Sequence, residues 1–402
     1  MQIFFKFSEN KSRTYTITAG KIFLYNPLIM LNSGFFKFMA IGGGNETGAS
    51  CYALEIGDCK ILLDAGIRNA QDFIAKTPNL IPLFRKWGVD GLWEFDAVVI
   101  SHAHIDHTGA LPSFMHDLED VKIFSSEATP DMIYAQHGNL KNKLLASIYD
   151  RLIPLPFFKK VRIKNLDITL FPAGHIPGAA MTLIENDDIK ILYTGDFCFF
   201  DQLTVKGAII PEGLKINTLI CESTYGYSDS IGELNLHSLA DQINSLLARG
   251  NIFSCTVRNS GKSAEIVAAV RKCVELGLIP DIYIWLGDDV QNSCTVCEKW
   301  SAVKIFDDHV RKLNEFDNNA QGLIITSKPA GFNELVFNMS NHASCSEILN
   351  LTAKIRPEKI VFVHGTQMLN TPRNVLREIP ERFGNSINAL HSINGEEINL
   401  KE

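Results

Sequence analysis

The chain has 402 residues, of which 46% are hydrophobic and 21% are charged. This is the composition of an ordinary globular protein with two or three domains, and it excludes a disordered chain, a fibrous repeat and a small disulfide scaffold. The net charge of −7 argues against broad binding of polyanions, although a metal-loaded cleft can be locally positive.

The cellular setting is predicted from the apolar runs and the cysteines. The apolar runs all fall short of the roughly 18 residues of a membrane span, and residues 1–15 do not resemble a signal peptide. The nine cysteines are odd in number and scattered, and several lie in apolar stretches, as reduced buried thiols do. We therefore expect a cytoplasmic protein without a membrane partner.

Strands dominate the first half of the chain. Residues 1–35 contain strand-like pieces without recognisable chemistry, and a clearer pattern begins at Phe38. Short apolar or alternating segments, several bounded by glycine, then predict strands at 50–57, 59–66, 95–102, 121–126, 166–175, 181–185 and 189–196. The residues of chemical interest lie at or just beyond the C-terminal ends of these strands, where a rigid scaffold usually presents reactive groups.

From about residue 216 strands and helices alternate, which predicts a module with a parallel sheet. The strands expected here are 217–223, 251–257, 281–287, 322–327, 334–340 and 359–365. The helices expected between them are 233–250, 261–277 and 346–355. The polar stretch at 287–321 has no predicted element.

The strongest chemical signal is the sequence SHAHIDH at residues 101–107. Its three imidazoles and one carboxylate converge only if the backbone turns tightly after the preceding strand, and both groups are good ligands for Zn²⁺. The spacing predicts that His102 and His104 face one ion, whereas Asp106 and His107 face a second.

Three further strand ends complete a metal site. His175, Asp196 and His364 each follow a predicted strand. Together with the histidine cluster they supply seven ligands, which is enough for two ions with Asp196 shared between them. Two neighbouring metal ions suit displacement at phosphorus, because they generate a hydroxide and hold the phosphate oxygens.

The order of these motifs resembles that of the metallo-β-lactamase superfamily. The segments concerned are TGASCYAL (47–54), LLDAG (62–66), SHAHIDHTGALP (101–112), GHIPGA (174–179) and YTGDF (193–197). Three more segments resemble the additional motifs of the β-CASP nuclease branch, which includes ribonuclease J-type enzymes and the endonuclease of messenger-RNA 3′-end processing. They are ICESTYG (220–226), SNHA (340–343) and FVHGT (362–366).

The resemblance implies two zinc ions per chain and a ligand set for each. The implied ligands are His102, His104 and His175 for one ion, Asp106, His107 and His364 for the other, and Asp196 as a bridge between them. Asp64 would lie behind the ligands and orient a ligand histidine, as metal sites usually require.

Catalytic roles for Asp106, Glu222 and His342 are also implied by the resemblance. A hydroxide bridging the two zinc ions would attack phosphorus, and substitution of Asp106 would abolish cleavage. His342 would donate a proton to the leaving oxygen while Glu222 supports its imidazole. Elementary chemistry supports both roles. Expulsion of an alkoxide needs a proton donor, and a neighbouring carboxylate keeps an imidazole cationic near neutral pH.

The second module departs from the usual β-CASP pattern. It is much shorter, which implies a shorter or more open groove, and ITSKPAG (325–331) replaces a glycine-rich segment. Gly261-Lys262 stands where Gly-Arg usually precedes a helix, and Lys is a less directional partner for phosphate than Arg. The expected phosphate contacts are Ser260, Lys262 and Ser327.

Two weaker motifs carry less weight. Residues 260–263 resemble the end of a nucleotide-binding P-loop, but Thr256 stands where the first glycine belongs. Cys294 and Cys297 form an isolated C-x-x-C pair without a second pair at zinc-finger spacing, so a structural zinc site is not expected there.

We therefore predict an α/β chain in which a four-layer αββα metallo-β-lactamase domain carries an inserted small α/β module of the β-CASP type. The predicted limits are 36–215 with 346–402 for the first domain, 216–345 for the insert and 1–35 for an extension of unknown role.

The predicted reaction is zinc-dependent hydrolysis of phosphodiester bonds in single-stranded RNA. The alternatives are a hydrolase of a small ester or thioester on the same scaffold, a DNA nuclease and a non-catalytic RNA-binding subunit. The sequence leaves open whether cleavage is endonucleolytic or proceeds from the 5′ end, and whether the chain forms a homodimer.

Overall fold

The computed structural model describes residues 15–18, 21–24, 35–69, 76–137, 148–229, 233–257, 261–337, 339–366, 371 and 374–401. The backbones of Tyr15–Thr18 (β1) and Lys21–Leu24 (β2) form an antiparallel pair. The rest of the predicted N-terminal extension, apart from Phe35, lies outside the described residues.

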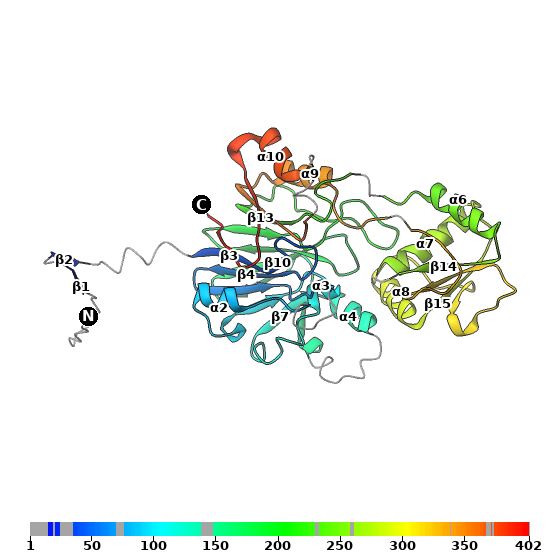
Figure 1. Ribbon diagram of the computed structural model, residues 1–402, viewed down its shortest axis with the longest axis horizontal. Coiled ribbons are helices and arrows are strands. Elements are labelled where there is room, and N and C mark those ends of the chain that lie inside the picture. Colours follow the sequence, from blue (N-terminus) through cyan, green and yellow to red (C-terminus); the bar gives the residue numbers. More distant parts are fainter. Residues whose placement is uncertain are drawn as a thin grey trace.

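Two seven-stranded sheets form the larger unit (Figure 1). The first consists, in spatial order, of Glu397–Asn399 (β21), Phe36–Gly42 (β3), Cys51–Ile56 (β4), Cys59–Leu63 (β5), Ala97–Val99 (β6), Lys122–Ser126 (β7) and Leu152–Leu155 (β8). The second consists of Asn388–His391 (β20), Lys359–Val363 (β19), Thr218–Glu222 (β13), Lys190–Tyr193 (β12), Ala180–Glu185 (β11), Leu166–Pro172 (β10) and Lys160–Ile163 (β9).

Each sheet is antiparallel on one side and parallel on the other. The pairs from β5 to β8 are parallel in the first sheet, as are the pairs from β12 to β20 in the second. Parallel neighbours end at the same edge of their sheet, so the loops that follow β5, β6, β12, β13 and β19 can meet there.

Alternating side chains of the strands divide between two hydrophobic cores. Leu62 and Val98 belong to the core that also contains the α2 residue Leu83. Their neighbours Leu63 and Val99 belong instead to a core shared by strands of both sheets. Because successive strand residues point to opposite faces, this division confirms the predicted order of helix layer, sheet, sheet and helix layer.

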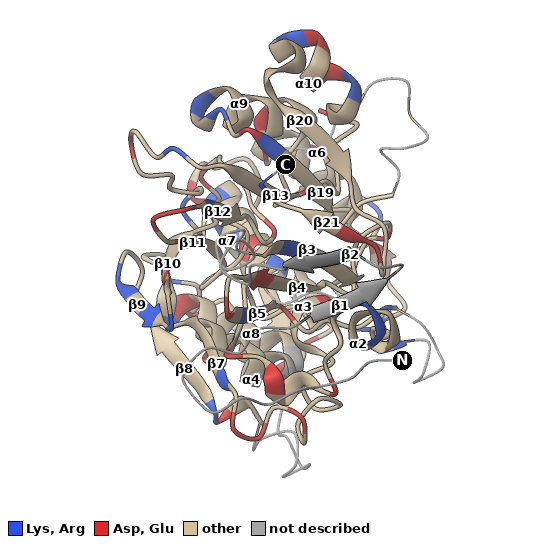
Figure 2. Ribbon diagram, turned by 90° about the vertical axis from the view of Figure 1, so that its left-hand side faces the viewer, with Lys and Arg blue, Asp and Glu red and all other residues tan. Residues whose placement is uncertain are grey.

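The outer helices of this unit are Ile81–Trp87 (α2), Ile105–Thr108 (α3), Thr129–His137 (α4), Cys345–Ile355 (α9) and Val375–Phe383 (α10). Two 3₁₀ turns, Leu92–Glu94 and Gly384–Ser386, accompany them. Figures 1 and 2 show α2 and α4 beside the first sheet and α9 and α10 beside the second. Figure 2 also shows basic and acidic residues interspersed on that side of the molecule.

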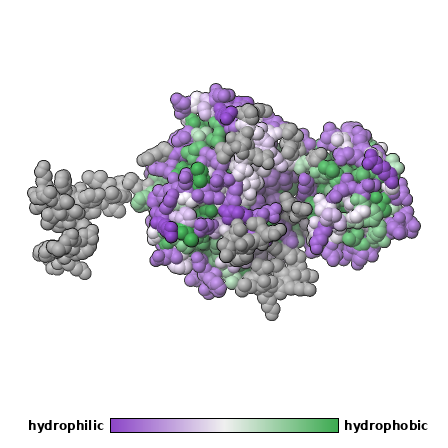
Figure 3. All heavy atoms as spheres, viewed as in Figure 1, coloured by the Kyte–Doolittle hydropathy of each residue, from purple (hydrophilic) through white to green (hydrophobic). Residues whose placement is uncertain are grey.

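A smaller unit contains a five-stranded parallel sheet. In spatial order its strands are Val310–Lys312 (β16), Tyr283–Leu286 (β15), Gly322–Thr326 (β17), Ile252–Thr256 (β14) and Asn333–Glu334 (β18). Its helices are Leu236–Leu247 (α6), Lys262–Glu275 (α7) and Asp288–Trp300 (α8), with a 3₁₀ turn at Leu313–Glu315. In Figure 3 the hydrophobic residues on the visible face gather mainly over this unit, whereas the larger unit is mostly hydrophilic there.

Three sequence predictions need correction in this region. The strand predicted at 217–223 forms as β13 but pairs with β12 and β19 of the larger unit, so we propose that the insert begins after Glu222 rather than at residue 216. The polar stretch at 287–321 contains α8, which buries Val290, Cys294 and Cys297 on one face. Of the described residues in the strand expected at 334–340, only Glu334 lies in a strand, the two-residue β18.

The two units also contact each other where α8 meets α4. Asp131 Oδ2 on α4 accepts hydrogen bonds from Lys299 Nζ at 2.6 Å and from Trp300 Nε1 at 2.7 Å. Within the described ranges, every helix is too short or too polar to cross a membrane.

Candidate metal centre

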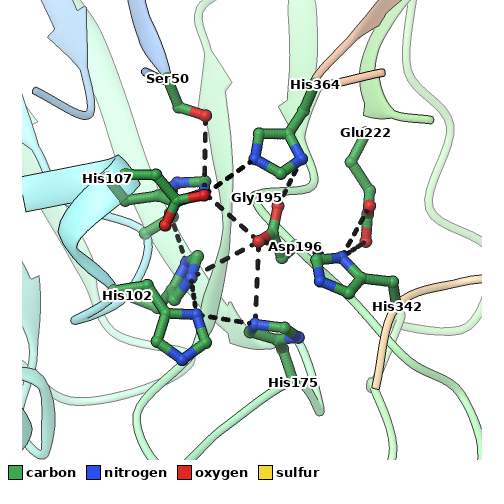
Figure 4. A network of polar contacts seen from close by, with 12 residues as sticks. Ser50, His102, His107, His175, Gly195, Asp196, Glu222, His342 and His364 are labelled. Atoms are coloured by element: carbon green, nitrogen blue, oxygen red, sulfur yellow. Dashed lines mark hydrogen bonds and ion pairs between the residues drawn. The ribbon is translucent and has the colours of Figure 1, made fainter. Parts of the chain in front are cut away.

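The predicted ligands come together at the C-terminal ends of strands from both sheets (Figure 4). His102, His104, Asp106 and His107 follow β6 and turn into the short helix α3. Gly66 allows this tight turn, since a Cβ at that position would lie 1.6 Å from the carbonyl oxygen of Asp106.

His175 follows β10, Asp196 follows β12 and His364 follows β19 directly. These three residues come from widely separated parts of the chain, and the two sheets place them beside the α3 turn. The structure thus assembles all seven residues that the sequence singled out as ligands.

The first ligand group contains His102, His104, His175 and Asp196, all of them buried. His104 Nδ1 lies 3.0 Å from His102 Nε2 and 3.1 Å from His175 Nε2. Asp196 Oδ2 is 3.5 Å from His102 Nε2 and 3.7 Å from His175 Nε2. Three imidazole nitrogens and one carboxylate oxygen therefore converge on one small volume, as the ligands of a tetrahedral ion do.

The second ligand group contains Asp106, His107 and His364. His364 Nε2 lies 3.3 Å from Asp106 Oδ2, and His107 Nε2 lies 3.3 Å from Asp196 Oδ2. Asp196 Oδ1 is 3.6 Å from His364 Nδ1. Asp196 thus faces both groups, which is the position that a shared ligand needs.

The donor set fits divalent metal ions. Asp196 Oδ1 is buried and accepts no hydrogen bond from any described residue, and such an oxygen is costly unless a cation or a donor approaches it. Burial lowers the pKa of His102 and of His175 well below the ordinary range, so both imidazoles are neutral and can offer a lone pair.

Asp64 contacts the second ligand group through His107. This fully buried residue adopts a left-handed backbone conformation with φ of 57°, which Asp tolerates better than most residues. Its carboxylate accepts hydrogen bonds from Ser101 N at 2.6 Å, Ser101 Oγ at 2.7 Å and Tyr193 OH at 2.6 Å. His107 Nδ1 lies 2.7 Å from Asp64 Oδ2, so Nε2 of His107 is left to face Asp196.

Other residues orient the remaining histidines in the same way. Thr224 Oγ1 lies 2.9 Å from His364 Nδ1, and the carbonyl oxygen of Asn341 lies 2.8 Å from His175 Nδ1. The side-chain amide of Asn341 also donates to the carbonyl oxygen of His175 at 2.8 Å. The sequence interpretation gave no role to Thr224, Asn341 or Tyr193, although each lies within one of the motif segments that carry the resemblance.

Glu222 and His342 form a pair beside the ligand groups. His342 Nδ1 lies 3.0 Å from Glu222 Oε2, and Glu222 Oε1 accepts a hydrogen bond from Phe197 N at 2.9 Å. Burial alone would lower the pKa of His342, but the carboxylates of Glu222 and Asp196 outweigh burial and raise it to about 9. The ring centroid of His342 is 4.5 Å from that of His175, so this imidazole borders the first ligand group.

The expected phosphate contacts are less closely grouped. Lys262 begins α7, and its Nζ donates to the carbonyl oxygen of Met339 at 3.3 Å, three residues before His342. Burial lowers the pKa of Lys262. Ser327 lines a cavity of about 550 Å³ together with Phe316 and Phe332 of the same unit. Ser260 lies outside the described residues.

An αββα sandwich with histidines and aspartates gathered at the strand ends defines a class of metal-dependent hydrolases. Residues 44–244 match the family model described as the metallo-beta-lactamase superfamily, and the chain belongs to this superfamily. This membership confirms the predicted fold class and supports the predicted class of enzyme.

Curated relatives carry a more specific name. Endoribonuclease ysh1 of Aspergillus fumigatus is 28% identical over 299 residues, which cover 69% of this chain and 33% of that protein. Endoribonuclease ysh-1 of Neurospora crassa is 31% identical over 57% of this chain and 28% of its own length, and YSH1 of Saccharomyces cerevisiae is 29% identical over 59% and 32%. The matched part thus spans about a third of these relatives, which are consistent with the predicted β-CASP branch.

A solved structure shares the fold. The crystal structure of a protein of unknown function from Enterococcus faecalis V583 aligns with 91% of this chain and 100% of its own, with a TM-score of 0.57 and 14% sequence identity. At this identity the likeness supports the architecture alone.

Proposed function

We propose that the chain hydrolyses phosphodiester bonds in single-stranded RNA and that it uses two zinc ions to do so. The observation that carries this proposal is the Glu222–His342 pair, in which Nδ1 and Oε2 are 3.0 Å apart beside the two ligand groups. A hydrolase of small esters on this scaffold has no need of that pair, whereas cleavage of an RNA strand must protonate a poor alkoxide leaving group. The names of the curated relatives support the same reaction.

The seven ligand residues would hold the metal ions. His102, His104 and His175 would hold one ion, Asp106, His107 and His364 the other, and Asp196 both. When bound, the two ions would lower the pKa of water and offset the negative charge that develops on a phosphodiester.

His342 would supply the proton. Its Nδ1 is engaged by Glu222, so Nε2 is the nitrogen left to face a leaving oxygen. Glu222 is itself fixed by Phe197 N at 2.9 Å, which keeps its carboxylate in place while the proton moves. The carboxylates of Glu222 and Asp196 raise the pKa of His342 to about 9, which is the direction of shift that a proton donor needs.

Lys262 would contact a phosphate of the bound strand. Its ammonium group has Met339 O as a hydrogen-bond acceptor at 3.3 Å, and a cation held against a neutral carbonyl keeps its charge available for an anionic ligand. Ser327 lies with residues of its own unit around the cavity beside Phe316, so we assign it at most a contact with a distant part of the strand.

A cleavage assay tests the proposal. A single-stranded RNA labelled at its 5′ end and a DNA of the same sequence would be incubated with zinc-loaded protein and with protein treated with a chelator. We expect chelator-sensitive cleavage of RNA alone, and the fragment ladder separates internal cuts from stepwise removal of nucleotides.

Two results would overturn the proposal. Equal cleavage of both strands would identify a nuclease without preference for RNA. Intact RNA and DNA in the presence of verified two-zinc protein, with turnover of small esters or thioesters, would identify the alternative hydrolase.

A further inference from the structure

The loop that follows Asp196 is fastened by three carboxylates from three different elements. The contacts are Phe197 N to Glu222 Oε1 at 2.9 Å, Phe199 N to Glu347 Oε1 at 3.1 Å, and Leu203 N to Glu265 Oε1 at 2.7 Å. Glu222 ends β13 and Glu347 lies in α9, both in the larger unit. Glu265 belongs to α7 of the insert, so its contact crosses from one unit to the other.

Glu265 makes the strongest of these attachments. It is 1% exposed and accepts two more hydrogen bonds, from Thr204 N at 2.9 Å and from Thr204 Oγ1 at 2.7 Å. Its position in the first turn of α7 favours a carboxylate there, because the N-terminal end of a helix carries partial positive charge. A buried carboxylate with three donors holds residues 203–204 in one arrangement.

The same loop reaches the first ligand group through Gln202. The amide Nε2 of Gln202 donates to the carbonyl oxygen of Gly174 at 2.6 Å and to that of His175 at 3.0 Å. Gly174 has a φ of 76° and packs so closely that a Cβ would lie 2.3 Å from the carbonyl oxygen of Cys198. The backbone that presents His175 is therefore shaped by residues 198–202.

Further contacts from the insert converge on the same backbone. A Cβ at Gly261, which immediately precedes α7, would lie 2.7 Å from the side chain of Ile176, the residue after His175. Asn341, at the far end of the insert, binds both Nδ1 and the carbonyl oxygen of His175 at 2.8 Å. The start of α7 and the end of the insert thus enclose one ligand histidine.

We propose that Glu265 and Gln202 are positioning residues that couple the insert to the first metal ion by way of His175. Glu265 fixes residues 203–204, Gln202 transmits this position to the carbonyl oxygens of Gly174 and His175, and Nε2 of His175 is thereby aimed at the ion. The inference rests on the proposed metal centre, and it assigns to the insert a role in metal binding in addition to any contact with RNA.

The coupling is selective for one ion. His107, in the second group, is oriented by Asp64 at 2.7 Å, and both residues lie in the core of the larger unit. Loss of the Glu265 contacts leaves this orientation intact. The two zinc ions should therefore respond differently to the same substitution.

Zinc titration against a chromophoric chelator, resolved into two dissociation constants, tests this inference. The variants are Glu265→Gln, which turns one acceptor oxygen into a donor group facing another donor, and Gln202→Met, which removes both donors at similar volume. The matched control is Glu298→Gln on α8, because Glu298 Oε2 likewise accepts from two backbone amides, Ile305 N and Phe306 N at 2.9 Å, but within the insert alone.

We expect Glu265→Gln and Gln202→Met to raise the dissociation constant of one ion by about threefold to tenfold, near the lower limit for residues that orient a metal ligand. The other ion and both ions of Glu298→Gln should stay within about twofold of wild type. The double variant should lose little more than either single variant, since both substitutions break one chain of contacts.

Three outcomes would overturn the inference. Unchanged constants in folded Glu265→Gln protein would show that its contacts do not reach the ion. Equal weakening of both ions would indicate general destabilisation, and a normal Gln202→Met variant would exclude the route through Gln202. Wild-type protein that binds no zinc would instead defeat the proposed metal centre itself, so the two failures are distinguishable.

Discussion

The two ligand groups of the metal centre are held in different ways. His107, in the second group, is fixed by Asp64, which also binds Ser101 and Tyr193 within the core of the larger unit. His175, in the first group, is surrounded by contacts from the insert and from the loop after Asp196. His107 is thus held within the sandwich, whereas His175 also depends on how the insert is seated against it.

This difference distinguishes a rigidly held ligand group from one whose position can change. A buried carboxylate with four donors inside a packed core has few alternative arrangements, so the second group should be preorganised. A histidine held through a loop and a second unit can shift when that unit shifts. The proposed proton donor His342 lies beside His175, with the ring centroids 4.5 Å apart, so the proposed protonation step would take place at the adjustable half of the site.

The largest expected effect is on turnover. His342→Ala removes the proton donor and should lower the rate of RNA cleavage by about 10²-fold to 10⁴-fold. The zinc content should not change, because His342 is not among the seven ligands. Metal analysis beside single-turnover cleavage checks both statements.

His104→Ala is the control, since His104 Nδ1 lies within 3.1 Å of two other ligand nitrogens and its loss should remove zinc together with activity. Loss of zinc from the His342 variant would show that this residue belongs to the ligand set, and the separation between chemistry and metal binding would fail.

The next largest effect is expected for the second ligand group, in which Asp64 holds His107. In Asp64→Asn an amide would face the hydroxyl of Tyr193 and Nδ1 of His107, and the proton of His107 would move to Nε2, which points at Asp196. We expect a loss of about 2 to 4 kcal/mol in the free energy of unfolding, because buried donors lose their acceptor, together with loss of the second ion. Urea unfolding and zinc titration measure the two effects.

Tyr193→Phe is the matched variant for Asp64→Asn. It removes one donor to Asp64 and keeps the ring, so it should cost about 1 kcal/mol and leave both ions bound. Equal loss of zinc in both variants would mean that the charge of Asp64 has no special role at His107.

The same comparison explains what the sequence could predict. Residues 101–107 place four ligands in one short segment, and His175, Asp196 and His364 each follow a segment with a strand pattern. Parallel strands bring their ends to one edge, so the ligand set could be inferred from local patterns and the motif order. The pair of packed sheets was implied by the family resemblance of these motifs.

Contacts between the units could not be predicted in this way. Glu265 and Gln202 are single polar residues without a surrounding motif, and their importance arises only when α7 is seated against the loop after Asp196. The strand β13 has the same local pattern whether it pairs with β12 or starts the inserted sheet, so its pattern alone could not show which sheet it joins. Helix α8 was not predicted, because two of its buried positions are Cys294 and Cys297, which were considered as an isolated C-x-x-C pair and not as part of an apolar stripe.

A smaller effect is expected where the insert returns to the sandwich. Ser344 begins α9 with a capping box: Ser344 Oγ accepts from Glu347 N at 3.3 Å, and Glu347 Oε2 accepts from Ser344 N at 2.9 Å. Ser344→Ala should cost about 1 kcal/mol of stability, the usual value of an N-cap. Glu347 also binds Phe199 N, so a slight weakening of the first ion should accompany this loss, whereas Ser344→Asn, which keeps a cap, should restore both.

The smallest effect is expected at the contact between α4 and α8. Asp131 binds Lys299 and Trp300, which joins the two units as the Glu265 contacts do, but the Lys299 side chain is 62% exposed and Trp300 is 39% exposed. Asp131→Asn should lower the free energy of unfolding by less than about 1 kcal/mol, because water screens exposed ion pairs. Both zinc constants should stay unchanged, since this contact has no link to His175. If Asp131→Asn weakens the first ion as strongly as Glu265→Gln does, then the general seating of the insert controls that ion, and the path through Gln202 is not needed to explain the difference between the two groups.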